Sequence, residues 1–305
     1  MSANLRLAIT ADLHWGTHDN GDDATGLMLA FLRQQPPDVL ILAGDIGAGD
    51  HFAECLALFD DLSCRKALVP GNHDIWVTDN DPRGDSLQVY QEYLPKISGE
   101  HGFHYLDHGP LFLKEASGGS DPPGSADLAL VGSINWYDYS WSVEQLKTRI
   151  HDWERRLRSK LFSRGRHNDA RFVRWALNDE EFTTLVVEAL DKHLKDALSQ
   201  AGKAILIAHH PPFYGLTFPR LMPPVTVDGL LWDAFSGNRR LELILTENAE
   251  RIPFVFCGHT HRARENTLDN IRGYNIGGDY HFKRLLMLDW PSGTVSAHVF
   301  GNPNG

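Results

Sequence analysis

The stretch Val39-Leu40-Ile41-Leu42-Ala43-Gly44-Asp45 decides how the chain folds, because five apolar residues run without a break into a glycine and an aspartate. A continuous apolar run of this length predicts a strand covered on both faces, as in an α/β sheet. A mainly apolar run lies at 5–10 and a third run lies at 66–69, and residues 24–34 and 51–62 between them carry apolar side chains at helical spacing. This β-α-β-α-β order predicts parallel strands joined by right-handed crossovers.

The second half of the chain predicts further strands on either side of a long helical region. Residues 142–200 have helical character, and Asn178 with Glu181 three residues later predicts a capping box. Segments rich in Asp, Gly, Pro and Ser predict loops at 78–86 and 117–126. The remaining elements are predicted as strands at 204–208, 253–257, 272–276, 285–288 and 294–299, the last three antiparallel, and a helix near 241–248.

The composition is that of an ordinary globular protein, with 42% hydrophobic and 23% charged residues in a chain of 305. Large α/β folds of this length often form one unit, so residues 1–305 are expected to be a single domain. Cys55, Cys64 and Cys257 lack the close spacing of a metal knuckle and are predicted to be reduced thiols. No membrane-length apolar run and no basic-then-apolar leader is present, so no membrane association and a cytoplasmic location are expected.

The charge of the chain is unevenly distributed. A net charge of −11 argues against non-specific nucleic-acid binding by the whole molecule. Residues 147–174, however, carry ten Lys or Arg against three acids. Two interpretations stay open: a solvated helical face that pairs with the acidic remainder, or an electropositive rim that attracts anionic substrates. Nothing in the sequence predicts the oligomeric state.

Polar residues of metal-ligand type follow each of five predicted strands. In an open α/β sheet, ligands bind beyond the carboxyl ends of the strands, so these loops can converge on one crevice. Their shared position at strand ends, rather than their spacing along the chain, is what places them together. The five segments are Asp12-Leu13-His14, Gly44-Asp45, Gly71-Asn72-His73-Asp74, His209-His210-Pro211 and Gly258-His259-Thr260-His261.

The donor types in these segments are carboxylate, imidazole and amide, without a thiolate. This mixture suits divalent ions of intermediate hardness such as Mn²⁺, Fe²⁺ or Zn²⁺ and does not suit a cysteine-type structural zinc site. Asp-x-His and His-x-His each place two side chains on one side of an extended segment, because strand side chains alternate with period two. Each pair can therefore address one metal cluster from one direction.

The five blocks, in this order, resemble the calcineurin-like metallophosphoesterase superfamily, whose pattern is D-x-H, G-D, G-N-H-D/E, H and G-H-x-H. The resemblance extends from residue 12 to residue 261. Each block alone is a weak signal, whereas all five in order, each after a strand, are a strong one. The resemblance implies an α/β fold, a four-layer αββα sandwich of two mixed β-sheets flanked by helices. It also implies a helical insertion, or cap, at about 135–203 over one side of the cleft.

The resemblance implies a role for each matching residue. One metal ion would bind Asp12, His14 and His261, the second would bind Asn72, His209 and His259, and Asp45 would bridge both. A hydroxide bridging the metals would attack phosphorus, His73 would protonate the leaving alkoxide, and Asp74 would orient His73. His209 is favoured over the adjacent His210 as the ligand, because the family histidine is followed by one variable residue and then by proline, here Pro211.

The predicted function is therefore hydrolysis of phosphoester bonds with two divalent metal ions (Mn, Fe or Zn), on a diester of small or nucleotide type. The alternatives are a nuclease that binds nucleic acid through 147–174, which is not favoured, a phosphoprotein or phosphomonoester phosphatase, and a non-catalytic metal-stabilised binding protein. The motifs do not fix the substrate. Residues that either pack in the core or face a substrate are Trp15, Trp136, Tyr137, Tyr139, Trp141, His210 and His281.

Overall fold

The computed structural model describes residues 4–113, 126–218 and 225–303 and contains two six-stranded sheets. Sheet A has the order β12 (Thr294–Gly301), β11 (Phe282–Trp290), β1 (Leu5–Thr10), β2 (Val39–Ala43), β3 (Arg65–Val69) and β4 (Phe103–Tyr105). Sheet B has the order β5 (Leu111–Leu113), β6 (Ala126–Ser133), β7 (Ala201–Ala208), β8 (Phe254–Cys257), β10 (Ile271–Asn275) and β9 (Arg264–Leu268).

Both sheets are mixed, with a parallel centre and antiparallel edges. In sheet A, β1, β2, β3 and β4 pair in parallel, while β11 and β12 are antiparallel. In sheet B, β6, β7, β8 and β10 are parallel, and β5 and β9 form antiparallel edges. The parallel strands at the start of the chain and the antiparallel pairing of β11 with β12 confirm the predictions, whereas β10, also predicted to be antiparallel, pairs in parallel with β8 and is antiparallel only to β9. The sequence did not reveal β4, β5, β6 or β9, of which β4 and β5 are only three residues long.

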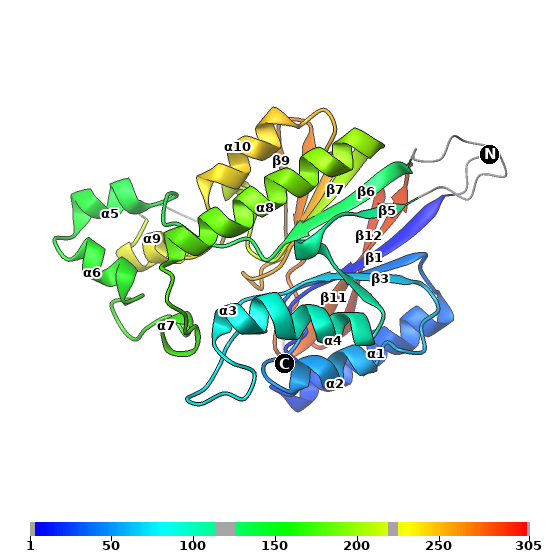
Figure 1. Ribbon diagram of the computed structural model, residues 1–305, viewed down its shortest axis with the longest axis horizontal. Coiled ribbons are helices and arrows are strands. Elements are labelled where there is room, and N and C mark those ends of the chain that lie inside the picture. The colour runs from blue at the N-terminus through cyan, green and yellow to red at the C-terminus, as the bar shows by residue number, and fades with distance from the viewer. Residues whose placement is uncertain (1–3, 114–125, 219–224, 304–305) are drawn as a thin grey trace.

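The two sheets face each other across an apolar core. Alternate residues of β1 and β2, such as Leu7 and Ile41, point inward and pack with Ile205 and Phe256 of sheet B. The residues between them, such as Leu40, point outward and pack beneath helices. Because strand side chains alternate, a strand covered on both faces must be apolar throughout. Figure 1 shows the resulting layers of helix, sheet, sheet and helix, which confirm the predicted four-layer αββα sandwich.

Helices cover the outer face of each sheet. On sheet A the apolar residues of α1 (Asp19–Gln34), α2 (His51–Ala57) and α4 (Leu94–Glu100) complete the core, and on sheet B those of α8 (Asp179–Gln200) and α10 (Arg239–Glu247) do so. The other helical segments are α3 (Ser86–Gln88), η1 (Val89–Tyr93), η2 (Leu106–His108), α5 (Val143–Arg149), α6 (Trp153–Arg158), α7 (Asp169–Phe172), η3 (Tyr214–Leu216) and α9 (Val227–Ala234).

The segment between β6 and β7 has two parts. Its last helix, α8, packs on both strands as an ordinary crossover helix does and begins with the predicted capping box of Asn178 and Glu181. The preceding helices α5, α6 and α7 gather with α9 at one end of the molecule, beyond the sheets (Figure 1). The cluster of buried residues around sheet A continues into this end. The boundaries 135–203 for an insertion, and the single domain 1–305, stay predictions.

Two further expectations concern the loop at 117–126 and the absence of a membrane-spanning segment. Residues 117–125 of the predicted loop lie outside the described residues. Among the helices that the structure describes, none combines the length and the apolar character that a membrane crossing requires.

The close approach of the sheets gives a stability prediction. A Cβ added at Gly132 of β6 would lie 2.6 Å from Val69 of β3, so Gly132→Ala overpacks the inter-sheet core. We expect a loss of about 1–3 kcal/mol in the free energy of unfolding, measured from urea midpoints. Gly99→Ala is the matched control, because an added Cβ there meets no atom within 4 Å. That change, on the exposed side of α4, should raise stability by about 0.5–1 kcal/mol. Equal midpoints for the two variants would contradict the packing.

Candidate metal centre

The residues predicted to bind metal come together at the carboxyl ends of the strands of both sheets. Oxygen and nitrogen atoms of Asp12, His14, Asp45 and His261 lie within 4.8 Å of one another, and so do those of His209, His210 and His259. The first group draws on both sheets, because Asp12 and Asp45 follow β1 and β2 of sheet A whereas His261 follows β8 of sheet B, and the histidines of the second group follow β7 and β8. The five predicted loops therefore converge, as expected.

The first group surrounds a point between Asp12 and His14. The Nε2 atoms of His14 and His261 are 3.0 Å apart, and His14 Nε2 lies 3.6 Å from Asp45 Oδ2. His261 Nε2 lies 3.7 Å from Asp12 Oδ1. Asp12 Oδ2 is buried and has no hydrogen-bond partner among the described residues. A buried carboxylate oxygen without a donor is costly, and a cation bound among these atoms removes that cost.

The second group is centred on the Asn72 side chain. Asn72 Oδ1 lies 3.1 Å from His209 Nε2 and 3.3 Å from His259 Nδ1. His209 Nε2 in turn lies 3.4 Å from Asp45 Oδ1. Asp45 therefore presents Oδ1 to this group and Oδ2 to His14 of the first group, which is the placement expected of a bridging ligand.

The adjacent histidines are held in different ways. His209 Nδ1 bonds the carbonyl oxygen of Ala43 at 3.0 Å, which turns Nε2 toward Asn72 and Asp45. Burial lowers the pKa of the His209 imidazole, but the nearby Asp45 carboxylate outweighs burial and raises it to about 9. His210 Nδ1 bonds Ile134 O, and its ring lies 4.0 Å from that of His259. Its Nε2 is buried and has no partner in the part of the chain that the structure describes. Burial lowers the pKa of His210 to about 3, so this imidazole is neutral.

The donor set fits two divalent cations. Carboxylate, imidazole and amide atoms surround each point, and neutral imidazole is the form that binds metal. Burial lowers the pKa of His14 and of His259 well below the usual value, which leaves both rings neutral. Burial would raise the pKa of Asp45, yet His209 and His73 hold it well below its usual value, so the Asp45 carboxyl is an anion.

The backbone at the site is strained. A positive φ is uncommon outside glycine and costs of order 1–3 kcal/mol. Such residues cluster at functional sites, and here they include Asp12, His14, Asp45, His259 and His261, with φ between 46° and 71°.

Two neighbouring glycines accommodate this geometry. Gly44 has φ +87°, and a Cβ on it would lie 2.4 Å from His209. Gly71 leaves room for Asp45, whose Oδ1 would lie 2.1 Å from an added Cβ. A side chain at either position would therefore displace a predicted ligand.

Asp74 has a different position from the one expected. Its Oδ1 accepts the backbone N–H groups of Ile46 (2.8 Å) and Gly47 (2.9 Å), and its Oδ2 accepts that of Gly71 at 2.7 Å. Among the described residues, no hydrogen bond joins Asp74 to His73. Asp74 therefore ties the loop after β2 to the loop after β3, and the expected contact with the imidazole of His73 is absent.

His73 is positioned by other contacts. Its backbone N–H donates to Asp45 Oδ1 at 2.9 Å, and its Nε2 lies 3.8 Å from Asp45 Oδ2. The imidazole stacks on the Trp76 indole, with ring centroids 3.6 Å apart and an interplanar angle of 25°. The side chain is 18% exposed, so it reaches the cavity while most of its surface is covered. Burial lowers the pKa of His73, and the carboxylates of Asp45 and Asp169 oppose this effect.

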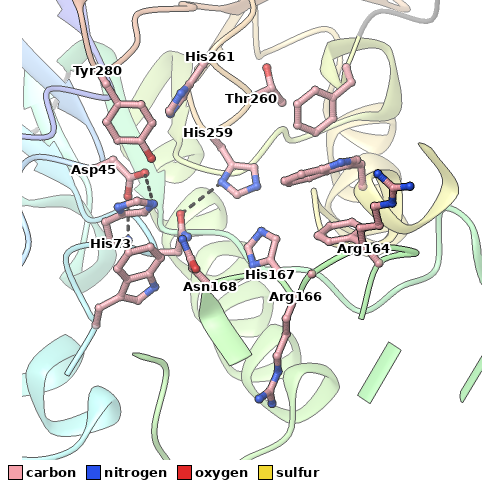
Figure 2. Close-up of a pocket in the computed structure, with 16 residues that line it drawn as sticks. Asp45, His73, Arg164, Arg166, His167, Asn168, His259, Thr260, His261 and Tyr280 are labelled. Atoms are coloured by element: carbon pink, nitrogen blue, oxygen red, sulfur yellow. Dashed lines mark hydrogen bonds and ion pairs between the residues drawn. The ribbon is translucent and has the colours of Figure 1, made fainter. Parts of the chain in front are cut away.

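A cavity of about 410 Å³ opens from the metal centre toward α7 and α9. Figure 2 shows His73, His259, His261 and Tyr280 on one side of it and Arg164 on the other. The far side also carries Phe162 and Trp232, whose rings stack with centroids 4.6 Å apart. Phe218 lies next to Trp232 at 5.3 Å. The cavity therefore has a polar, metal-binding end and an aromatic end.

The aromatic wall differs from the one considered in the sequence. Trp136, Tyr137, Tyr139 and Trp141 are buried, at most 5% exposed, and none of them lines this cavity. Trp136 donates to Asp179, and Tyr137 donates to Asp169. Trp15 packs partly buried against the core, and His281 lies beside His18, both outside the cavity lining.

Four residues of the site carried no motif and were missed. Tyr280 stacks on His14 with centroids 4.3 Å apart, and Trp76 stacks on His73. Lys283 is fully buried and donates from Nζ to the backbone oxygens of Asp12 (3.2 Å) and Asp279 (2.6 Å). Asp169, on α7, receives a hydrogen bond from Asn72. A lysine in a mainly apolar strand and one of the three acids in the basic segment were the only signals in the sequence.

The basic segment is largely neutralised by ion pairs. Six of its ten cations contact an acid. The pairs are Lys147–Glu144, Arg155–Asp152, Arg156–Asp152, Arg158–Glu154, Lys160–Asp179 and Arg174–Asp79. This agrees with a solvated, paired face. Arg164 and Arg166, which line the cavity, have no acidic partner among the described residues.

The family model for calcineurin-like phosphoesterases matches residues 5–263. The chain therefore belongs to the calcineurin-like phosphoesterase family, as its five blocks indicated. It is a phosphoric ester hydrolase of the dimetal class. The residues present fit two ions.

Individual proteins that the chain resembles are also hydrolases of phosphoesters. Over 145 residues, the chain is 29% identical to the acyl-carrier-protein phosphodiesterase PptH of Mycobacterium tuberculosis, a match that covers 47% of this chain and 41% of that protein. The crystal structure of the phosphopantetheinyl hydrolase PptH from the same organism has a TM-score of 0.66 at 19% identity, with 92% of both chains covered. A dimetal phosphatase from Danio rerio has a TM-score of 0.55 at 14% identity, covering 97% of this chain and 98% of that one. At such identities, the structures show a common fold.

The bridging position of Asp45 gives a metal-binding prediction. The unchanged protein should bind two Mn²⁺ ions per chain in calorimetric titration of metal-free protein. Asp45→Ala should weaken both, by more than the roughly 10–100-fold typical of losing an outer-shell partner. His281→Ala is the matched control and should bind both ions, because His281 lies outside both groups. An Asp45→Ala variant with two unaltered sites would show that Asp45 is no bridge.

Proposed function

We propose that the chain is a phosphodiesterase in which His73 protonates the leaving group. The observation that carries this proposal is the position of His73 beside the bridging Asp45, facing the cavity without belonging to either metal-binding group. Bound at these groups, the metal ions would supply Lewis-acid activation of the attacking water and of the phosphoryl oxygens. Mn²⁺, Fe²⁺ or Zn²⁺ suits the donor set.

The chain's own residues would bind the ions, supply a proton and position the loops. Asp12, His14 and His261 would hold one ion, Asn72, His209 and His259 the other, and Asp45 both. A water oxygen would form a bond to phosphorus as the ester P–O bond breaks on the opposite side. The alkoxide released would take a proton from the imidazolium form of His73, a step typically worth about 10²–10⁴-fold in rate. The neutral ring would regain a proton from the attacking water. Asp74 would contribute by fixing the loops that carry Asp45 and Asn72.

The shape of the cavity supports a diester with a flat organic group. A diester carries two organic arms, and the cavity offers space of about 410 Å³ beyond the metal centre. Trp232 is 39% exposed there and stacks on Phe162, which makes an aromatic surface suited to a nucleobase. Arg164 on the same side adds a cation that suits an anionic substrate. We therefore favour a small, nucleotide-type diester.

A second candidate substrate is a phosphopantetheinyl group attached to a carrier protein. It is favoured by the similarity to the acyl-carrier-protein phosphodiesterase PptH, a relative of which the match covers less than half. Higher kcat/KM on a phosphopantetheinylated carrier protein than on nucleoside diesters would select this candidate. A nuclease is less favoured because the basic segment is mostly paired, and a monoester phosphatase would leave the aromatic end without an occupant. A cytoplasmic location stays a prediction.

Replacing the proposed proton donor should separate metal binding from turnover. His73→Ala should bind two Mn²⁺ ions yet lose about 10²–10⁴-fold in kcat. The loss should be largest for an alkyl diester, whose alkoxide needs a proton, and smallest for a 4-nitrophenyl diester, whose phenolate leaves unaided. His108→Ala, outside the cavity, is the control. An equal loss for both esters would remove His73 from the proton-donor role.

Substrate recognition at the aromatic end is tested with two esters that share one leaving group. Trp232→Ala should raise KM for thymidine 5′-(4-nitrophenyl) phosphate by roughly 5–150-fold, since stacking of a base is worth about 1–3 kcal/mol. The KM for methyl 4-nitrophenyl phosphate should not change. Leu243→Ala serves as control, because Leu243 is an exposed apolar side chain outside the cavity. Equal changes for both esters would exclude the aromatic surface as a nucleoside site.

A further inference from the structure

Asp169 is a buried carboxylate that joins α7 to the metal centre. It is 1% exposed, and four side chains contact its two oxygens. Burial would raise the pKa of this carboxyl, but His167 and the hydrogen bond from Asn72 hold it well below the usual value. Asp169 lies outside the two groups of predicted ligands, and no sequence motif marks it.

One oxygen of Asp169 determines how the Asn72 amide is turned. Oδ1 accepts the Trp76 indole N–H at 2.9 Å, and an indole nitrogen can only donate. The same oxygen lies 2.8 Å from Asn72 Nδ2, so the NH₂ end of the amide faces Asp169. Asn72 Oδ1 consequently faces His209 and His259, at 3.1 and 3.3 Å. The amide oxygen is the atom that a cation in the second group requires.

The same oxygen also fixes the ring that supports His73. The Trp76 indole, held through its N–H by Asp169, stacks on the His73 imidazole at a centroid distance of 3.6 Å. Among the described residues, the His73 ring has no hydrogen bond, and its nearest charged atom is Asp45 Oδ2 at 3.8 Å. The imidazole also meets the edge of the His14 ring at a centroid distance of 4.6 Å, and Trp76 is the nearer of these two rings that orient it.

The other oxygen anchors Asp169 itself. Oδ2 accepts the Tyr137 hydroxyl at 2.8 Å and lies 3.3 Å from His167 Nδ1. Tyr137 is fully buried and stacks on Trp136. Asp169 is therefore held by the core on one side and acts on the site on the other. Oδ2 holds Asp169 to the core, and Oδ1 contacts Asn72 and Trp76.

We propose that Asp169 is a positioning residue: it orients the Asn72 amide for the second metal ion and, through Trp76, the imidazole of His73. This couples the segment between β6 and β7 to both the metal centre and the proposed proton donor. The part concerning His73 rests on the proposed function, whereas the part concerning Asn72 requires only metal binding.

Metal binding tests the first part without any activity measurement. Mn²⁺ alone is titrated into metal-free protein by calorimetry. Asp169→Ala should weaken one of the two Mn²⁺ sites by about 10–100-fold and leave the other unchanged. Asp169→Asn should recover most of the affinity, because its amide oxygen can still accept from Asn72 and Trp76 while its NH₂ donates to the Tyr137 oxygen. Should Asp169→Ala not fold, Asp169→Ser replaces it, since the shorter side chain leaves space for water.

Tyr137→Phe is the matched control for a purely structural role. It removes a bond to Oδ2 and leaves the contacts of Oδ1 with Asn72 and Trp76. This variant should lose thermal stability but bind both Mn²⁺ ions with unchanged affinity. Two unaltered sites in Asp169→Ala, or the same selective loss in Tyr137→Phe, would overturn the assignment to Asn72.

Turnover tests the second part. Trp76→Phe keeps an aromatic ring beside His73 and removes the N–H that Asp169 holds. It should bind both Mn²⁺ ions, leave KM unchanged and lower kcat more for an alkyl diester than for a 4-nitrophenyl diester. Equal kcat losses for the two esters would overturn the coupling to His73. If His73→Ala itself shows no dependence on the leaving group, the proposed function fails, while the result for Asn72 stands on the calorimetry.

Discussion

The structure depends on a carboxylate, Asp45, held where the ends of the two sheets meet. Its Oδ1 is near His209 from sheet B and accepts the backbone N–H of His73, while its Oδ2 is near His14 from sheet A. Such a concentration of buried anion and imidazole is unfavourable without compensation. Cations bound among these groups would compensate it, and the family uses dimetal chemistry. The two sheets hold the Asp45 carboxylate in this position.

The loops around Asp45 are strained, and the rest of the fold supports them. Five predicted ligands have positive φ angles, a conformation that persists only where the surroundings enforce it. Parallel strands packed on both faces provide rigid starting points, and carboxylates tie the loops together. Asp74 links the loops after β2 and β3, and Asp12 accepts the backbone N–H of His259 at 3.0 Å. Binding residues are thus positioned by hydrogen bonds between loops as well as by their strands.

The sequence predicted the parts of the molecule that leave local patterns. A mainly apolar run identified β1, an unbroken one identified β2, and polar residues at strand ends identified the candidate metal ligands. Interactions between distant segments left no such pattern. Asp169 reaches Asn72 across 97 positions, and the expected partner of His73, Asp74, proved to bind backbone groups instead. The sequence did not predict the aromatic end of the cavity, because Phe162 and Trp232 meet only through packing of α9 on the preceding helices. The aromatic residues of 136–141, which the sequence suggested, lie in the core.

We propose that loops from both sheets hold two cations bridged by Asp45. Anomalous diffraction from crystals of the full chain grown with Mn²⁺ tests it most directly. If Asp45 bridges two ions, the anomalous map should show two peaks roughly 3.5–4 Å apart, with the Asp45 carboxylate touching both. The first should lie among Asp12, His14 and His261, the second among Asn72, His209 and His259. A single peak, or two peaks that share no carboxylate, would contradict it.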